Sequence, residues 1–272
     1  MDRFSLNKKR IDNVRENITK NYMVSDGPPE GFFLPKEYLE KMKEVGEKYK
    51  NVRWLPLDIP KIEFDDFDEF EDIWKQESIE VLRIKPDVAE PWTKDDHPYG
   101  PASSWHIPQF QGLTIWRNPR SEHQTVTFAE KLYTGQNKQF DRIVDQAFTY
   151  FPIHTMFSIF IWKSTMEIKP HRDRSSFWKC PTEFRSMLYD ENPDPTLYVA
   201  DIEHGDMHYI DLPKDTNSFC WSNGTQIHGS DYYGKNKYLL CISGIQHSKK
   251  SDELFERSIN KYKDVLNYKL DL

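Results

Sequence analysis

Apolar residues recur at helical spacing in several stretches of the chain. Between residues 5 and 22, Ile11, Val14 and Ile18 repeat every three or four positions among charged residues, and the Asp-Gly-Pro-Pro run that begins at Asp26 ends the pattern. The same spacing predicts further helices over residues 36–49, 63–72, 139–151 and 255–266. The second of these four is rich in acids interleaved with aromatics, which favours a helix with a solvated acidic face over a cation-binding loop.

Short apolar runs bounded by turn residues predict strands in the second half of the chain. We expect these strands over residues 156–162, 184–189, 196–201, 207–212, 217–221 and 237–243, with a turn over 163–167 that leads to Ile168 and His171. His204-Gly205-Asp206 is typical of a hairpin tip, because Gly accepts a positive φ. We expect His208 to point out of its strand or into a core pocket.

Residues 90 to 125 combine many Pro, Trp, Tyr and His residues. Two interpretations fit this composition equally well. The stretch forms a lid or a wall that recognises substrate, or it is a long loop held in place by its aromatic side chains.

Composition limits the class of protein. Aromatic residues make up 14% of the 272 positions and charged residues 30%, which suits a packed core with a well-solvated exterior. The net charge of −7 disfavours binding to nucleic acid. Cys180, Cys220 and Cys241 are odd in number and widely spaced, as in a reducing compartment. Since no stretch resembles a signal peptide or a membrane span, we expect a cytoplasmic protein.

Two histidines and an aspartate are candidate metal ligands. His171-Arg172-Asp173 follows a predicted strand and turn, and His228 comes after 54 intervening residues. That separation allows about four strands, which is enough to bring the distant His beside the first pair. Two imidazoles and one carboxylate suit one face of an octahedral Fe(II), leaving three positions open for chemistry, and zinc accepts the same ligands.

The stretch from about residue 150 to 245 resembles the Fe(II)- and 2-oxoglutarate-dependent oxygenases. The resembling residues are Ile168 to Asp173, Asn192-Pro193, Gly205-Asp206, Asn223-Gly224, His228 and Lys237. Within that superfamily it is most similar to the aspartyl/asparaginyl β-hydroxylase and proline hydroxylase branch. Met166-Glu167 departs from the Gly-containing turn of many relatives, and the N-terminal half lies outside the resemblance.

The resemblance implies roles for particular side chains. His171, Asp173 and His228 match the iron ligands, and Lys237 stands where relatives hold the distal carboxylate of 2-oxoglutarate, usually with Arg. Lys supplies the charge without the bidentate geometry of Arg. Lys235 is an alternative to Lys237 for this role. In a further interpretation, Lys237 is an ordinary surface lysine. Arg185 faces the cosubstrate or the substrate acid, or else forms a surface ion pair.

The resemblance also implies a fold and an activity. We expect an α+β chain with a mainly β core, a double-stranded β-helix (jelly roll) with flanking helices. A single oxygenase-like domain comprises residues 1–272, with a helical and loop region over 1–135, the jelly-roll core over 136–246 and a C-terminal helix over 247–272. Because Asp173 is retained, unlike in halogenating relatives, hydroxylation or desaturation is favoured.

The expected cofactors are Fe(II), 2-oxoglutarate and O2, and the expected substrate is a small molecule, an amino acid or a peptide side chain. Two alternatives stay open. One is a cupin-like or jelly-roll metal-binding protein without oxygenase turnover, and the other is an interaction protein built around the aromatic N-terminal region.

Overall fold

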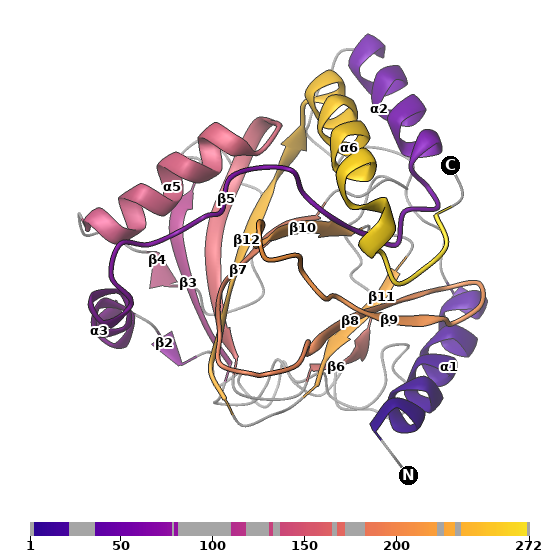
Figure 1. Cartoon of the computed structure of the whole chain (residues 1–272), viewed down its shortest axis with the longest axis horizontal. Helices are drawn as coiled ribbons and strands as arrows, with labels where there is room; N and C mark the ends of the chain where they lie inside the picture. Colours follow the sequence, from indigo (N-terminus) through magenta and orange to yellow (C-terminus); the bar gives the residue numbers. More distant parts are fainter. Residues whose placement is uncertain are drawn as a thin grey trace.

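The described part of the chain folds into two mainly antiparallel β-sheets with α-helices around them (Figure 1). The computed structural model describes residues 3–21, 36–77, 79–80, 110–117, 131–132, 137–164, 168–171, 183–221, 226–231 and 235–270. These residues form five α-helices, namely α1 (Arg3–Asn21), α2 (Lys36–Lys48), α3 (Phe67–Glu77), α5 (Lys138–Tyr150) and α6 (Ser248–Tyr262). Among these helices, none combines the length and apolarity needed to cross a membrane.

The two sheets differ in size. In order, the larger one contains β1 (Trp54–Pro56), β10 (Ser218–Trp221), β7 (Glu183–Asp190), β12 (Lys237–Gln246), β5 (Ile153–Ser164), β3 (Phe110–Arg117) and β2 (Ile79–Glu80), with β4 (Lys131–Leu132) also paired to β3. The smaller one contains β6 (Ile168–His171), β11 (Gln226–Ser230), β8 (Leu197–Asp201) and β9 (Met207–Tyr209). The chain therefore forms an α+β fold.

The chain moves back and forth between the sheets from β5 onwards. Strands β5, β7, β10 and β12 belong to the larger sheet, whereas β6, β8, β9 and β11 belong to the smaller one. Strands that are distant in sequence thereby become neighbours, as β6 and β11 do. This pairing brings the two candidate histidines together.

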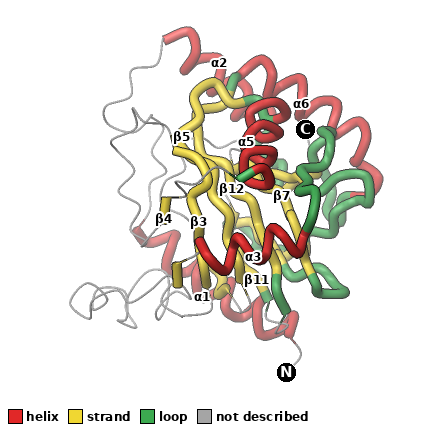
Figure 2. Tube along the Cα trace, turned by 90° about the vertical axis from the view of Figure 1, so that its left-hand side faces the viewer, coloured by secondary structure: helices red, strands yellow, loops and turns green. Residues whose placement is uncertain are grey.

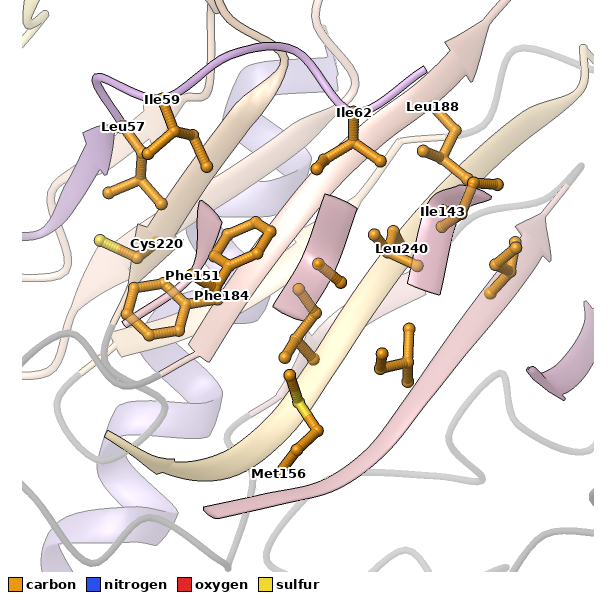
Figure 3. Close-up of a cluster of buried hydrophobic side chains, with 14 of the residues drawn as sticks. Leu57, Ile59, Ile62, Ile143, Phe151, Met156, Phe184, Leu188, Cys220 and Leu240 are labelled. Carbon is orange, nitrogen blue, oxygen red and sulfur yellow. The ribbon is translucent and has the colours of Figure 1, made fainter. Parts of the chain in front are cut away.

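Alternation along β12 separates two apolar clusters. Leu240 and Ile242 join the core on the helix-covered face of the larger sheet, where Figure 3 shows Ile143 of α5 near Leu240. Leu239 packs instead with Phe219 and Trp221 in the core between the sheets. Because successive side chains point to opposite faces of a strand, Lys237 shares the inner face with Leu239.

Helices cover the outer faces of both sheets. Helix α5 contacts β3 and β5 of the larger sheet, and α1 contacts β6 of the smaller sheet (Figures 1 and 2). The apolar side of α1 packs against the outer side chains of β8 and β11 through Ile11, Val14, Tyr198, Ala200 and Ile227. Both faces of the smaller sheet are thus buried. Its outer face carries apolar side chains, and its inner face carries some polar ones.

The helices predicted over 5–22, 36–49 and 139–151 and the strands over 156–162, 184–189 and 237–243 are confirmed to within about three residues. The last helix is displaced, because α6 begins at Ser248 instead of residue 255 and ends at Tyr262 instead of residue 266. The acidic helix begins later than predicted, at Phe67, since the carboxylate of Asp66 accepts a 3.1 Å hydrogen bond from the Glu69 amide. The hairpin tip at Gly205 is also confirmed, with a φ of 72°. The Asp201 carboxylate accepts hydrogen bonds from the amides of that turn.

Two predictions about the N-terminal region were wrong. Residues 1–135 are not only helical and looped, since β1 to β4 join the larger sheet. Part of the 90–125 stretch is β3, buried between β5 and β2, and not a loop. A strand buried on both faces lacks the alternation that marks a half-exposed strand. Residues 90–109 and 118–125 of that stretch lie outside the described residues.

A candidate metal and carboxylate site

Two buried imidazoles meet across β6 and β11. His171 and His228 are paired Cα to Cα in the antiparallel register, and their ring centroids lie 4.3 Å apart. Only 6% of His171 and 7% of His228 is exposed. His228 lies in β11, a strand that the sequence did not predict. The predicted meeting of the two histidines is confirmed.

Gly229 keeps β11 close to its neighbours. A Cβ at this position would lie 2.6 Å from Tyr198 Cζ and 2.8 Å from the Ile168 carbonyl oxygen. A side chain there would push against the backbone of β6 on one side and a buried ring of β8 on the other. Glycine therefore allows β11 to fit between them, with His228 and Ser230 on the inner side.

Imidazole nitrogen is a donor that several divalent metals accept. Both rings come from paired strands, so their backbones are held in place, and the ring centroids lie 4.3 Å apart with 59° between the ring planes. Asp173, the predicted third ligand, lies outside the described residues. Within the described residues, no group of three or more His, Cys, Asp or Glu side chains is arranged to hold a metal. His171 and His228 are accordingly the part of the predicted triad that can be located.

Lys237 brings a positive charge between the sheets. Its side chain is 4% exposed, and its ammonium donates to Thr196 Oγ1 at 3.1 Å and to Ser230 Oγ. Burial lowers the pKa of Lys237 to about 8, while the negative charges of Asp190 and Asp231 act in the opposite direction. Lys237 therefore points inward, and the surface-lysine interpretation is wrong. Lys235, the competing residue, is exposed.

The Lys237 ammonium contacts a residue two positions after His228 on the same strand. Ser230, which accepts its hydrogen bond, follows His228 by two positions on the inner side of β11. Two residues of extended strand span roughly 7 Å. The hydroxyl that contacts Lys237 is therefore about 7 Å along β11 from the position of His228.

Asp231 supplies a buried negative charge beside this cation. Its carboxylate accepts a 2.6 Å hydrogen bond from Asn7 Nδ2 and another of 2.6 Å from the Tyr209 hydroxyl. Hydrogen bonds of this kind stabilise an ionised carboxylate in a buried position. The carboxylate in turn favours the charged form of Lys237.

Arg185 is the second buried cation on the inner side. It is 8% exposed, and its Cζ lies 4.7 Å from the centroid of the Trp221 ring. Its Cα partner on β12 is Cys241, four positions after Lys237, so the two cations stand well apart along the strands. The surface ion-pair interpretation of Arg185 is wrong, because the side chain is buried.

His208 belongs to a separate polar cluster. Its Nδ1 contacts the Asn267 carbonyl at 2.9 Å, and its Nε2 contacts an Arg53 nitrogen. Burial and the Arg53 charge lower the pKa of this imidazole. His208 is therefore half-buried among polar groups and does not lie in the apolar core.

No protein-family model matches this chain, and no curated protein sequence matches it. The interpretation of the site therefore depends on its own geometry.

Sequence reasoning missed several members of the site. Ser230 carried a usable signal, because it follows His228 at the two-residue spacing of a strand face. Thr196 and Asp231 carried none, since their contacts come from other strands and from α1. Trp221 ends a predicted strand, but its contact with His228 depends on how the two sheets face each other.

Proposed function

We propose that the protein is an Fe(II)- and 2-oxoglutarate-dependent dioxygenase that oxidises a C–H bond of a small molecule, an amino acid or a peptide side chain. One observation carries the proposal. His171 and His228 meet inside the fold, and the buried Lys237 ammonium lies beside Ser230, one strand repeat from His228. Two imidazoles and a buried cation at this spacing suit a metal and one end of a short keto diacid.

The order of the strands supports a jelly-roll core. Strands β10, β7, β12 and β5 are neighbours in the larger sheet, and β6, β11, β8 and β9 form the smaller one. The chain alternates between these two groups of four, and the antiparallel pairs join strands that are distant in sequence. Eight strands shared between two facing sheets in this manner are typical of a jelly roll.

Each side chain has a defined task in this proposal. His171 and His228, together with Asp173, hold the iron, and their paired strands fix the positions of the two imidazoles. Lys237, Thr196 and Ser230 bind the distal carboxylate of 2-oxoglutarate by charge and hydrogen bonds. The apolar cluster that includes Val199, Phe219 and Leu239 excludes water from this side of the site.

Bound iron supplies the oxidative chemistry, in which 2-oxoglutarate, O2 and a C–H group yield succinate, CO2 and an alcohol. The chain binds, orients and shields the reactants. Arg185, buried on the same inner side, is a candidate to hold an acidic group of the substrate.

Anaerobic binding of Fe(II) and 2-oxoglutarate tests the proposal. We expect a visible charge-transfer band that needs both components and is lost in His171→Ala and Asp173→Ala. His204→Ala is the matched control, because His204 belongs to the other His-x-Asp sequence and is exposed at a hairpin tip. This variant should keep the band.

Two results would contradict the proposal. The absence of a band in folded, metal-loaded protein would exclude the oxygenase. Metal binding without any response to 2-oxoglutarate would favour a metal-binding jelly-roll protein without turnover. The circular dichroism spectra of the Ala variants must match that of the unmodified protein, so that misfolding is not mistaken for loss of the site.

A further inference from the structure

We propose that Trp221 is a positioning residue that fixes the ring of His228 in the orientation needed for metal binding. The inference rests on the proposed function for its biological meaning, since it assigns His228 to the metal. The contact itself is independent of that assignment. The Trp221 and His228 ring centroids lie 5.1 Å apart, with 32° between their planes.

His228 has aromatic neighbours from both sheets. Trp221 comes from β10 in the larger sheet, whereas His171, at 4.3 Å, comes from β6 in the smaller one. The outer torsion of a histidine side chain has a broad energy profile, so a lone imidazole turns easily. Packing against two rings narrows that range and favours one orientation.

The Trp221 backbone is itself well held. It pairs with Trp54 of β1 and with Glu183 of β7, so it has a strand neighbour on either side. Phe219 lies beside it, with ring centroids 5.5 Å apart. Trp221 is also 3% exposed. It therefore offers His228 a surface that changes little when the site fills.

The guanidinium of Arg185 adds a third contact to the same indole. Its Cζ lies 4.7 Å from the ring centroid, a distance at which a cation is attracted to the aromatic face. The buried Arg185 thus helps to set the position of Trp221, and Trp221 helps to set that of His228. A buried cation and a metal-binding imidazole are linked through one indole.

Trp54 provides a matched control for substitution. It is fully buried, packs in the same cluster, and is the Cα partner of Trp221 across β1 and β10. Its ring nitrogen donates to Asn267 Oδ1 at 3.2 Å, away from the histidine pair. Trp54→Leu and Trp221→Leu therefore remove similar apolar volume, but only Trp221→Leu removes a neighbour of His228.

Co(II) affinity of the metal-free protein, measured by calorimetry, gives the first readout. We expect Trp221→Leu to weaken binding by about tenfold or more, as outer-shell substitutions do. Trp221→Phe should recover part of the loss, because it restores an aromatic face. Trp54→Leu should stay within about twofold of the unmodified protein, although both Leu variants lose unfolding free energy. Equal affinities in Trp221→Leu and Trp54→Leu would overturn the inference.

A nuclear Overhauser effect between ring protons of His171 and His228 gives the second readout, in metal-free protein. It should persist in Trp54→Leu and weaken or vanish in Trp221→Leu. An unchanged signal in Trp221→Leu would count against positioning. If the unmodified protein binds no Co(II), the proposed function fails, while this signal still decides the role of Trp221.

Discussion

Asn7, near the start of α1, donates a 2.6 Å hydrogen bond to the carboxylate of Asp231, 224 positions later in the chain. Asp231 directly follows β11 and lies three positions after His228. The first helix is therefore tied by a buried polar contact to the strand that carries a candidate metal ligand. Its apolar side packs on the same sheet through Ile11 and Val14.

Asn7→Ala should lower the free energy of unfolding by about 1–3 kcal/mol, because it removes a buried hydrogen bond to a charged group. Urea denaturation measures the change. Lys9→Ala, exposed on the same helix, should alter stability by less than about 0.5 kcal/mol. Equal losses of unfolding free energy in the two variants would show that the effect comes from substitution in the helix and not from loss of the Asn7 hydrogen bond.

Lys237→Met should be more stable than the unmodified protein at pH 7, and its advantage should shrink above pH 8. In the folded protein the pKa of Lys237 is lowered to about 8, whereas the unperturbed value is 10.5. The unfolded chain thus binds more protons between these values, so stability rises with pH across that window. Below it, burying the ammonium costs on the order of 3 kcal/mol. Urea denaturation of both proteins at pH 7 and 9.5 measures the difference, and a constant difference would contradict the shifted pKa.

The affinity for 2-oxoglutarate should fall about tenfold for each pH unit above 8, because only the protonated amine attracts a carboxylate and its population falls at that rate. Calorimetry on metal-loaded protein between pH 7 and 9.5 measures it. Lys237→Arg should flatten the profile, since Arg stays charged throughout. A profile that is equally steep in the Arg variant would assign the pH dependence to another group.

Thr196→Val should raise the KM for 2-oxoglutarate several-fold while changing kcat little. The substitution keeps the shape of the side chain and removes the hydroxyl that contacts Lys237 at 3.1 Å. Thr216→Val is the matched control, because Thr216 is also buried but bonds to the Leu57 carbonyl instead. A rise in KM of similar size in both variants would point to general destabilisation.

Gly229→Ala should destabilise the protein by about 1–3 kcal/mol and weaken metal binding, since the added methyl group presses on Tyr198 and on the Ile168 carbonyl. Gly112→Ala on β3 is the comparison, because the three atoms nearest to its added Cβ all belong to the half-buried Trp162 ring and none to the backbone. Thermal unfolding and Co(II) titration of both variants measure the effects. If Gly229→Ala is destabilised but binds Co(II) with unchanged affinity, the close approach of β11 to its neighbours is not needed for metal binding.

The sequence predicted the parts of the fold that depend on local patterns. Helical spacing located α5, and the apolar run at Ile159 located β5, since each pattern reflects one buried side of one element. Strands β1 and β2 are only three and two residues long, too short to show a pattern. Strand β3 is buried on both faces, so its residues do not alternate.

The site was predictable only in part for a related reason. His171 and His228 could be proposed from residue type and separation, and Lys237 from the resemblance to known oxygenases. The contacts of Asp231 and Trp221 depend on tertiary packing, which no spacing within one segment encodes. The metal triad as a whole stays a prediction, because Asp173 lies outside the described residues.

The buried ammonium of Lys237 also bears on how this protein would respond to laboratory evolution. A charge held away from water makes the fold less stable than an apolar side chain of similar size would. Selection for heat resistance alone would therefore tend to replace Lys237 early, at the expense of whatever binds there. A library selected for both heat resistance and turnover should keep it.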